Sequence, residues 1–352
     1  MNFPPLQTPA ALIDIDIVER NIIAAQAQFN RLGVSFRPHV KTHKLVRFAE
    51  MQLAAGAVGI TCQKVSEAEH FILAGCDDVF ITYNILGEEK LGRLRSLAKD
   101  ARVSVVADSE LVVAGLSRAF ADATVPLEVL VECDTGLGRC GVQTPEAAAS
   151  LALTISRSEG LVFGGLMTYP PPDSHLLVED FMRAAKAACI STVGSCPRIS
   201  SGGTPSMKTL PQGTVVTEYR PGTYIYNDRS LVQRGACTLD DCAMTVIATV
   251  VSRPTPDRAI LDAGSKVLSS DLLGLSGHGL LRDYPQAIVN GLSEEHGHID
   301  LSHCTQRPEI GEVVAVLPNH ACVVTNLLDF VHLHRNGSFV ETVRVDARGA
   351  VL

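Results

Sequence analysis

The chain has 352 residues, 46% of them hydrophobic, and its formal net charge is −8. This length is enough for more than one domain, while the acidic balance without any basic stripe argues against a nucleic-acid-binding protein. Short apolar runs broken by charges argue against a membrane span. The N-terminal residues lack a signal-peptide pattern, and we expect the ten scattered cysteines to be reduced, mostly buried thiols of a cytoplasmic protein.

From residue 34 onward, short β-branched runs alternate with amphipathic helical stretches. The predicted strands are, in chain order, 34–40, 58–62, 78–83, 103–108, 127–134, 161–169, 197–203 and 215–221. Helical stretches such as 88–101 and 145–160 lie between them. This alternation predicts an α/β fold with a (βα)8 barrel of the TIM type. A doubly wound open sheet has the same order of elements and is the alternative.

Beyond residue 235 the pattern changes to strands with little helix between them. The predicted strands there are 244–254, 258–264, 312–320 and 339–345. We therefore expect a barrel over residues 12–226 and a β-rich domain made of residues 1–11 and 236–352. The short apolar segment 9–17 could pair with either domain.

The first predicted strand ends at Lys41, where a barrel would place an active residue. Four basic side chains flank this lysine: Arg37, His39, His43 and Lys44. Inside a barrel mouth, burial and cationic neighbours would make the amine of Lys41 nucleophilic. The alternative, which the spacing by itself favours, is a set of solvated surface side chains.

The fifth strand leads into TGLGRCG, in which Gly136, Gly138 and Gly141 have the G-x-G-x-x-G spacing. This spacing is weak support for a dinucleotide site. The motif lies in mid-chain, its helix starts late, and the next strand ends at Tyr169 rather than at an acidic residue. We therefore interpret the stretch as a flexible loop that lets Arg139 point inward.

Two glycine-containing loops follow the seventh and eighth strands, where barrels often bind phosphate. They are Ser201–Thr204, with the sequence SGGT, and Gly222–Thr223. Glycines let backbone N–H groups approach an anion, and hydroxyls add donors; each loop could also be an ordinary turn. Together with a nucleophilic lysine, such a phosphate site suggests pyridoxal 5′-phosphate (PLP) held as a Schiff base.

The stretch PNHACVVTNLLD contains His320 and Cys322, which would share a face on a strand. Imidazole and thiolate are good ligands for a metal such as Zn²⁺. A polar histidine beside a buried cysteine is the alternative. Further ligands could come from His175, His296 or His298, and the sequence selects none of them.

Together, several stretches resemble the PLP enzymes related to D-threonine aldolase and D-serine dehydratase. In chain order they are RPHVKTHK, GITCQKVSEAE, VECDTGLGRCGV, SGGTPS, RPGTYIYND, LDAGSK, LSEEHG and PNHACVVTNLLD. The resemblance covers nearly the whole chain and favours the D-threonine aldolase-like branch. It implies an alanine racemase-like fold (fold type III), PLP, a divalent metal (Mn, Zn, Mg or Co) and a homodimer.

The resemblance also assigns roles. It implies Lys41 as the Schiff-base lysine, Arg139 facing the phenolic oxygen of PLP, Tyr169 near the ring and Arg220 near the pyridine nitrogen. The loops expected to hold the phosphate contain Ser201, Gly202, Gly203, Thr204, Gly222 and Thr223, and Tyr226 is a further expected cofactor-binding residue. The implied metal pair is His320 and Cys322, beside the substrate's β-hydroxyl group.

Two departures from the family pattern concern the chemistry. Well-known aldolases carry His-x-Asp where this chain has His-x-Cys, which dehydratases of the family also use. Relatives often place a Gly-His pair after the sixth-strand tyrosine, but TYPPPDSH has only His175 nearby, so the general base stays open with His175 as candidate. We expect an aldolase that cleaves D-β-hydroxy-α-amino acids to glycine and an aldehyde. The alternatives are a D-serine or D-3-hydroxyaspartate dehydratase, an amino-acid racemase and a barrel-only PLP carrier, which the second domain disfavours.

Overall fold

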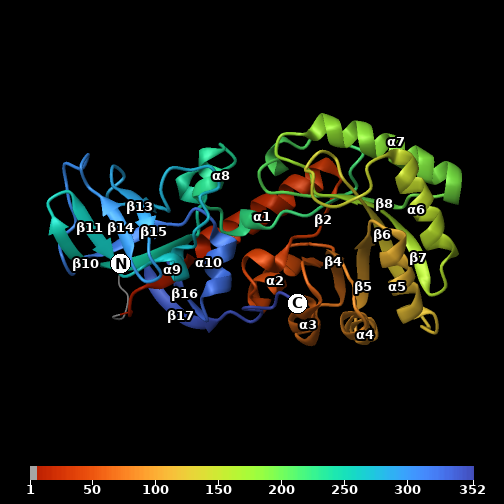
Figure 1. The fold of residues 1–352 in the computed structure, drawn as a ribbon, viewed down its shortest axis with the longest axis horizontal. Helices are drawn as coiled ribbons and strands as arrows, with labels where there is room; N and C mark the ends of the chain where they lie inside the picture. The colour runs from red at the N-terminus through yellow and green to blue at the C-terminus, as the bar shows by residue number, and fades with distance from the viewer. Residues whose placement is uncertain (1–5) are drawn as a thin grey trace. The chain divides into compact units, whose positions relative to one another are not determined.

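A computed structural model describes residues 6–352, which form two compact units (Figure 1). The barrel unit consists of Ala24–Lys41, Val46–Gly222 and Ala350–Leu352. The β-rich unit consists of the described residues up to Ile23, Thr42–Leu45 and Thr223–Gly349. The expected barrel range differs from this division at both ends and at residues 42–45. The assignment of PLP to one unit and the metal to the other remains a prediction.

The barrel unit has eight parallel strands, each of which we predicted within a few residues. The strands are β2 (Ser35–Phe36), β3 (Ile60–Cys62), β4 (Asp78–Asn84), β5 (Arg102–Ala107), β6 (Leu127–Cys133), β7 (Leu161–Thr168), β8 (Arg198–Ser201) and β9 (Glu218–Tyr219). The helices that follow them are α2 (Val46–Ala54), α3 (Val65–Leu73), α4 (Glu88–Leu97), α5 (Glu110–Phe120), α6 (Pro145–Arg157) and α7 (His175–Val193). In Figure 1 the helices lie outside the strands.

The strand order is β2-β9-β8-β7-β6-β5-β4-β3, which follows the chain around a ring. A parallel bridge between His39 and Thr61 joins the segment after β2 to β3 and closes the ring. The (βα)8 barrel is therefore confirmed, and the open doubly wound sheet is not. β2 and β9 are shorter than predicted because Pro38 and Pro221 follow closely, and proline cannot donate to the strand ladder.

The barrel interior has a polar base and an apolar middle. At the base, Arg37 donates to Glu218 (2.7 Å) and to Asp78 (2.6 Å), and Arg198 contacts Glu218 at 3.3 Å. Above them lies an apolar layer from four neighbouring strands: Phe80, Val106, Leu130 and Met167. Because these layers fill the lower part of the barrel, ligand chemistry is left to the carboxyl ends of the strands.

The β-rich unit is built on a nine-stranded sheet in the order β11-β14-β13-β12-β15-β10-β1-β16-β17. Its strands are β1 (Ala10–Asp14), β10 (Met244–Thr255), β11 (Arg258–Leu261), β12 (Leu280–Leu281), β13 (Ile288–Leu292), β14 (Gly297–Asp300), β15 (Val313–Leu317), β16 (Phe330–Arg335) and β17 (Ser338–Arg344). An additional pairing of β10 with β11 closes six of these strands into a ring.

The sequence left open which domain the apolar segment 9–17 pairs with. Its strand β1 belongs to the sheet of the β-rich unit, where it is antiparallel to β10 and parallel to β16. The unit also contains short helices: α8 (Arg229–Gln233), α9 (Ser265–Leu268) and α10 (Ala321–Leu327). The longer helix α1 (Ile15–Leu32) begins in this unit and ends in the barrel unit. Among the described residues, no helix is both long and apolar enough to cross a membrane.

Candidate active site

Lys41 lies in a single turn of 3-10 helix, Val40–Thr42, in the segment that follows the first barrel strand, β2. Its Nζ donates to Oε1 of Gln63 (3.2 Å), and Nε2 of His39 donates to the same oxygen (3.1 Å). Gln63 follows β3 and donates to the carbonyl of Thr82 at 3.0 Å. These bonds hold the amine, which is partly buried, at the carboxyl ends of the strands. Arg37, expected beside the lysine, instead belongs to the ion pairs at the barrel base.

Arg139 and Tyr169, both predicted site residues, lie together. The guanidinium of Arg139 is 4.9 Å from the centre of the Tyr169 ring. Arg139 lies in the loop after β6, and Tyr169 directly follows β7. This stacking places a cation and a planar aromatic ring at the same end of the barrel.

The glycines of TGLGRCG do not offer their amides to a phosphate. Asp134 accepts from the N–H groups of Gly136 (2.9 Å) and Gly138 (3.1 Å), and Asp108 accepts from that of Gly141 (3.2 Å). All three glycines have positive φ, so they serve a tight turn. The structure thus agrees with a loop that carries Arg139 rather than with a dinucleotide site.

The loop Ser201–Thr204 has the features of an anion cradle. Within the described part of the chain, no hydrogen bond uses the amides of Gly202 and Gly203. A Cβ at Gly202 would come within 2.8 Å of the carbonyl oxygen of Arg220, and Gly203 has a φ of +122°. The Tyr169 ring lies against Gly203. Two uncommitted amides at a strand end beside an aromatic ring fit the phosphate and ring of PLP.

Arg220 is buried inside the barrel and is held from two sides. Its Nε donates to Oγ of Ser200 (2.8 Å), and its Nη2 donates to the carbonyl of Thr168 (2.7 Å). Burial lowers the pKa of Arg220 to about 10, against the opposing effect of Glu218 and Glu132. The group is still a cation at neutral pH, as its predicted place near a pyridine nitrogen requires.

His175, the candidate general base, is the first residue of α7. Its Nε2 lies 3.1 Å from the carbonyl of Ser206, to which it donates, and 2.9 Å from Oγ1 of Thr209. These contacts tie the start of the helix to the loop that follows β8. The catalytic role of His175 stays a prediction.

The pair His320 and Cys322 lies at a helix start, and the prediction of a shared strand face is wrong. The strand β15 ends at Leu317, His320 is the N-cap residue of α10, and Cys322 lies in its first turn. The two side chains nevertheless hydrogen bond to each other. Burial disfavours both the imidazolium of His320 and the thiolate of Cys322, but the contact between the two side chains outweighs it. This contact raises the pKa of His320 to about 9 and lowers the pKa of Cys322.

Further polar groups surround this pair. Nδ1 of His320 lies 2.7 Å from Oδ2 of Asp271, so Nε2 is the imidazole nitrogen left for a metal. The sulfur of Cys322 is 3.1 Å from Oγ1 of Thr42 and 3.5 Å from Oγ1 of Thr223. A nitrogen and a sulfur donor backed by a carboxylate fit a borderline divalent metal.

Near the predicted site residues lie three polar residues that the sequence did not single out. Gln63 contacts the lysine and Asp271 contacts the histidine. Gln63 lies in the stretch GITCQKVSEAE, but within that stretch nothing marks this residue, and nothing in its local sequence marks Asp271. Glu132 is a buried acid near the end of β6. An acidic residue within the apolar run LEVLVEC was its only signal.

Thr223 and Tyr226 belong to the β-rich unit, whereas Gly222 closes the barrel unit. Tyr226 is fully buried, and burial followed by the charge of Cys322 raises its pKa. Its place among the cofactor-binding residues remains a prediction. His296 and His298 lie around the β13–β14 turn, where His298 bonds to Ser293 (3.1 Å).

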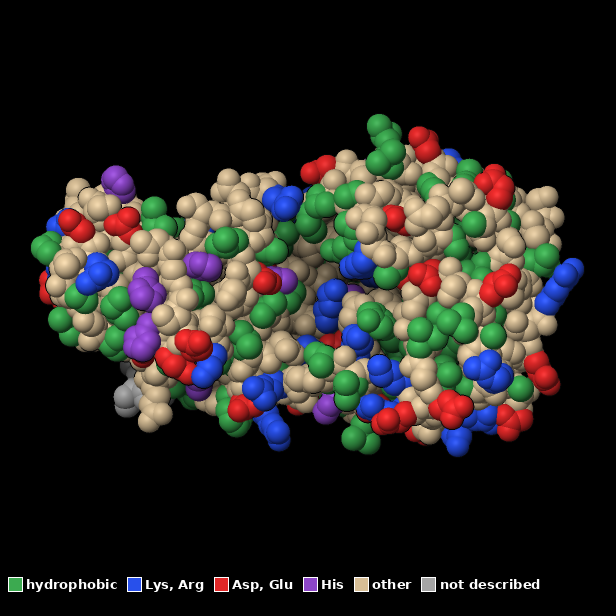
Figure 2. All heavy atoms as spheres, in the orientation of Figure 1, with side chains coloured by type: hydrophobic (Ala, Val, Ile, Leu, Met, Phe, Trp, Pro, Cys, Tyr) green, Lys and Arg blue, Asp and Glu red, His purple; other side chains and the backbone are tan. Residues whose placement is uncertain are grey.

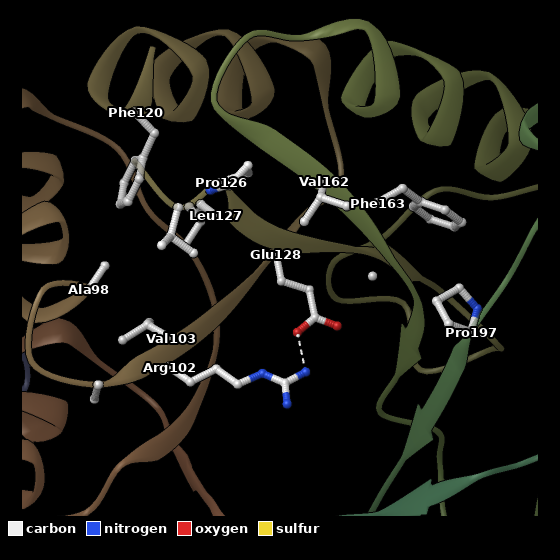
Figure 3. A pocket seen from close by; sticks show the side chains of 13 residues that line it. Ala98, Arg102, Val103, Phe120, Pro126, Leu127, Glu128, Val162, Phe163 and Pro197 are labelled. Atoms are coloured by element: carbon white, nitrogen blue, oxygen red, sulfur yellow. Dashed lines mark hydrogen bonds and ion pairs between the residues drawn. The ribbon is translucent and has the colours of Figure 1, made fainter. Parts of the chain in front are cut away.

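A pocket of about 420 Å³ lies at the opposite end of the barrel strands (Figure 3). It is lined by the first residues of β5, β6 and β7 and by the loops before them. Figure 3 shows Glu128 directed toward Arg102, with 3.4 Å between Oε2 and Nη2. Since barrel enzymes react at the carboxyl ends of their strands, we do not place the active site there.

Comparisons with known proteins cover nearly the whole chain. The alanine racemase N-terminal domain family matches residues 13–230, and the putative serine dehydratase domain family matches residues 243–334. D-threonine aldolase of Arthrobacter sp is 33% identical over 360 residues, 98% of this chain and 93% of the relative. D-threo-3-hydroxyaspartate dehydratase of Delftia sp. (strain HT23) is 30% identical over 347 residues, 90% of this chain and 91% of the relative.

Solved structures of the same two kinds of enzyme resemble this chain over nearly its whole length. A D-threonine aldolase from Filomicrobium marinum has a TM-score of 0.90 at 33% identity, covering 99% of this chain and 97% of that one. A variant of D-threo-3-hydroxyaspartate dehydratase, solved in a metal-free form, has a TM-score of 0.85 at 28% identity and covers 97% of each chain.

Proposed function

The chain belongs to the D-threonine aldolase-like family of lyases, whose barrel is of the alanine racemase type. From this membership we propose that the protein cleaves D-β-hydroxy-α-amino acids such as D-threonine into glycine and an aldehyde. The observation that carries the proposal is the partly buried amine of Lys41, held at the carboxyl end of the barrel by Gln63. An amine placed there can form an imine with an aldehyde cofactor.

PLP is the cofactor of the alanine racemase-like family, and when bound it supplies an electron sink for breaking a bond at the substrate's Cα. Lys41 would hold its aldehyde carbon. The free amides of Gly202 and Gly203 would bind its phosphate, and Arg139 stacked on Tyr169 would face its ring oxygen. Each role rests on the contacts described above and on the resemblance of these loops to the family.

His320 and Cys322 would hold a divalent metal, with Asp271 fixing the imidazole so that Nε2 can coordinate. A dication beside a substrate hydroxyl lowers the pKa of that hydroxyl. Among the family members described above, one was solved in a metal-free form. Loss of the β-hydroxyl proton is what cleavage of the Cα–Cβ bond requires.

Dehydration is the second candidate reaction. It is favoured by the His-x-Cys pair and by the 30% identity to a D-threo-3-hydroxyaspartate dehydratase. The same groups would then serve loss of the β-hydroxyl group after proton removal from Cα, and ammonia and a keto acid would form.

The test is a panel of D-β-hydroxy amino acids, assayed with and without a chelator for both product classes. With D-threonine we expect glycine and acetaldehyde, lost on chelation and restored by a divalent metal. Lys41→Ala should remove both the activity and the absorbance of the bound cofactor. Lys64→Ala is the matched control, because Lys64 lies at the same barrel end with its amine on the Tyr83 ring.

Three results would contradict the proposal: ammonia and keto acid as the only products, activity that survives exhaustive chelation, or an active Lys41→Ala enzyme. The first would favour the dehydratase, and the second would refute the part of the metal in the reaction. Metal-independent racemisation with neither product class would favour an amino-acid racemase. The face of the molecule in Figure 2 carries interspersed acidic and basic side chains, in keeping with a small-molecule substrate rather than a nucleic acid. We further propose a cytoplasmic homodimer, which sedimentation equilibrium and cell fractionation would test.

A further inference from the structure

Gln63 is held from two sides at the point where β3 ends and the chain enters α3. Its backbone N–H donates to Oε2 of the buried Glu67 (2.7 Å), and its side-chain Nε2 donates to the carbonyl of Thr82 in β4 (3.0 Å). Because Nε2 is committed to Thr82, the orientation of the amide is fixed, and Oε1 is the atom that faces Lys41. The side chain therefore presents its oxygen in one defined position.

The segment that carries Lys41 lies alongside β3. A parallel bridge pairs His39 with Thr61, and the N–H of Thr61 donates to the carbonyl of Pro38 at 2.8 Å. Two residues further along each segment are Lys41 and Gln63, whose side chains meet with 3.2 Å between Nζ and Oε1. The contact between lysine and glutamine is thus a consequence of the strand register that closes the barrel.

His39 supplies a second donor to the same oxygen. Its Nδ1 accepts from the backbone N–H of Lys41 (3.4 Å), so the ring hydrogen is on Nε2, which donates to Oε1 of Gln63 (3.1 Å). The histidine is buried, with 5% of its surface exposed. A carbonyl oxygen has two lone pairs, so Oε1 can accept from the imidazole and from the lysine at once. The imidazole keeps Oε1 in place when the lysine leaves it.

The contact orients the amine of Lys41 as well as placing it. An amine that donates one hydrogen to Oε1 directs its lone pair away from Gln63, and this lone pair is the part that attacks an aldehyde carbon. A lysine side chain is flexible, and its rotamer freedom opposes any single geometry. A hydrogen bond formed before the cofactor arrives removes part of this freedom, which speeds a reaction between groups that must meet in one orientation.

We propose that Gln63 is a positioning residue, whose amide oxygen holds the amine of Lys41 in place for imine formation with PLP. The inference deepens the proposed function and rests on it, because PLP is the aldehyde concerned. In this step a C=N bond forms between Nζ and the aldehyde carbon, and the aldehyde oxygen leaves as water with the two amine hydrogens. Gln63 exchanges no proton with either group. Its replacement therefore slows the step and leaves the non-covalent binding of the cofactor unchanged.

The experiment separates non-covalent binding from imine formation. Pyridoxine 5′-phosphate has the ring and phosphate of PLP but an alcohol in place of the aldehyde, so its dissociation constant measures non-covalent binding alone. Stopped-flow absorbance at saturating PLP then gives the rate constant of imine formation by the cofactor-free protein. The variants are Gln63→Met, which keeps the length of the side chain without the amide oxygen, and Gln63→Ala. The matched control is Gln143→Met, at an exposed position in the loop after β6 at the same barrel end.

We expect Gln63→Met and Gln63→Ala each to slow imine formation about tenfold, the effect of one lost hydrogen bond. The dissociation constant of pyridoxine 5′-phosphate should stay unchanged in both variants. Gln143→Met should change neither quantity. Lys41→Ala should still bind pyridoxine 5′-phosphate and should form no imine.

A merely structural role of Gln63 has a different outcome. If the residue only links β3 to β4, its replacement lowers the melting temperature of the cofactor-free protein and leaves the rate constant unchanged, which would overturn the inference. Weaker binding of pyridoxine 5′-phosphate by the same factor would show damage to the whole cofactor site and would overturn it as well. If neither Gln63 variant folds, His39→Phe decides, because loss of the second donor to Oε1 must slow the same step. Failure of the unmodified protein to form an imine with PLP would instead refute the proposed function.

Discussion

Replacing Asp271 by asparagine tests whether His320 is a metal ligand. The carboxylate of Asp271 lies 2.7 Å from Nδ1 of His320, and such partners typically change metal affinity 10- to 100-fold when they are mutated. The Asp271 side chain is 44% exposed, so water screens its charge and can replace part of its contact. We therefore expect the lower end of the range, about tenfold weaker binding, or about 1.4 kcal/mol.

The assay is competition for Zn²⁺ or Mn²⁺ with a chromophoric chelator, using cofactor-free protein at constant pH. The control is Asp283→Asn, an exposed acid of the same unit. The control should leave the affinity unchanged, and His320→Ala should weaken binding more than Asp271→Asn does. Equal affinity for Asp271→Asn and the unmodified protein would refute the role of this carboxylate. Equal affinity for His320→Ala would refute the metal site itself.

Two further predictions concern the barrel. Burial would raise the pKa of Glu218, but Arg37 and Arg198 outweigh burial, and the pKa is lowered. The ionised carboxylate of Glu218 therefore stabilises the folded protein above its unfolded-state pKa of about 4.3. This stabilisation is lost as the pH falls through the lower pKa that Glu218 has in the folded protein. Glu218→Gln should then cost about 3–5 kcal/mol of unfolding free energy at pH 7 and less in acid, measured by urea denaturation; an equal loss at both pH values would contradict this. Gly202→Ala would place a Cβ 2.8 Å from a carbonyl oxygen, and we expect it to weaken PLP binding at least about tenfold. The control Gly92→Ala, in open space on α4, should leave PLP binding unchanged. Equal PLP affinity of Gly202→Ala and the unmodified protein would exclude this loop from the phosphate site.

The barrel could be predicted from sequence because its strands are buried on both faces. β4, β5 and β6 are mostly apolar and have buried residues on both faces. Such runs, separated by amphipathic helices, are typical of parallel sheets. The β-rich unit was harder, and four of its strands (β12, β13, β14 and β16) were not predicted. β12 has only two residues, and β13 is interrupted by a register shift.

The helix α10 shows why local sequence was insufficient at the metal pair. The residues after β15 are rich in β-branched side chains, which favour a strand. The structure begins a helix there, and Oδ2 of Asp228 accepts from the N–H of Ala321 at 3.1 Å. Asp228 is 93 positions away in the chain, so this cap cannot be inferred from neighbouring residues.

Of the candidate site, the part at the strand ends was predictable. Lys41, Tyr169 and the loop at Gly202 lie at the carboxyl ends of predicted strands, and a barrel brings these ends together. The partners Gln63 and Asp271 were not predictable, because they depend on contacts between loops that carry no periodic pattern.

The position of β1 has a consequence for the order of folding during synthesis. On the ribosome, Ala10–Asp14 emerges before the whole barrel, yet both of its neighbours in the sheet, β10 and β16, are translated after it. Four of its five side chains are buried in the finished sheet. The nascent chain must therefore carry an apolar strand with open edges until more than two hundred residues have been added, which makes this segment a natural binding site for a chaperone.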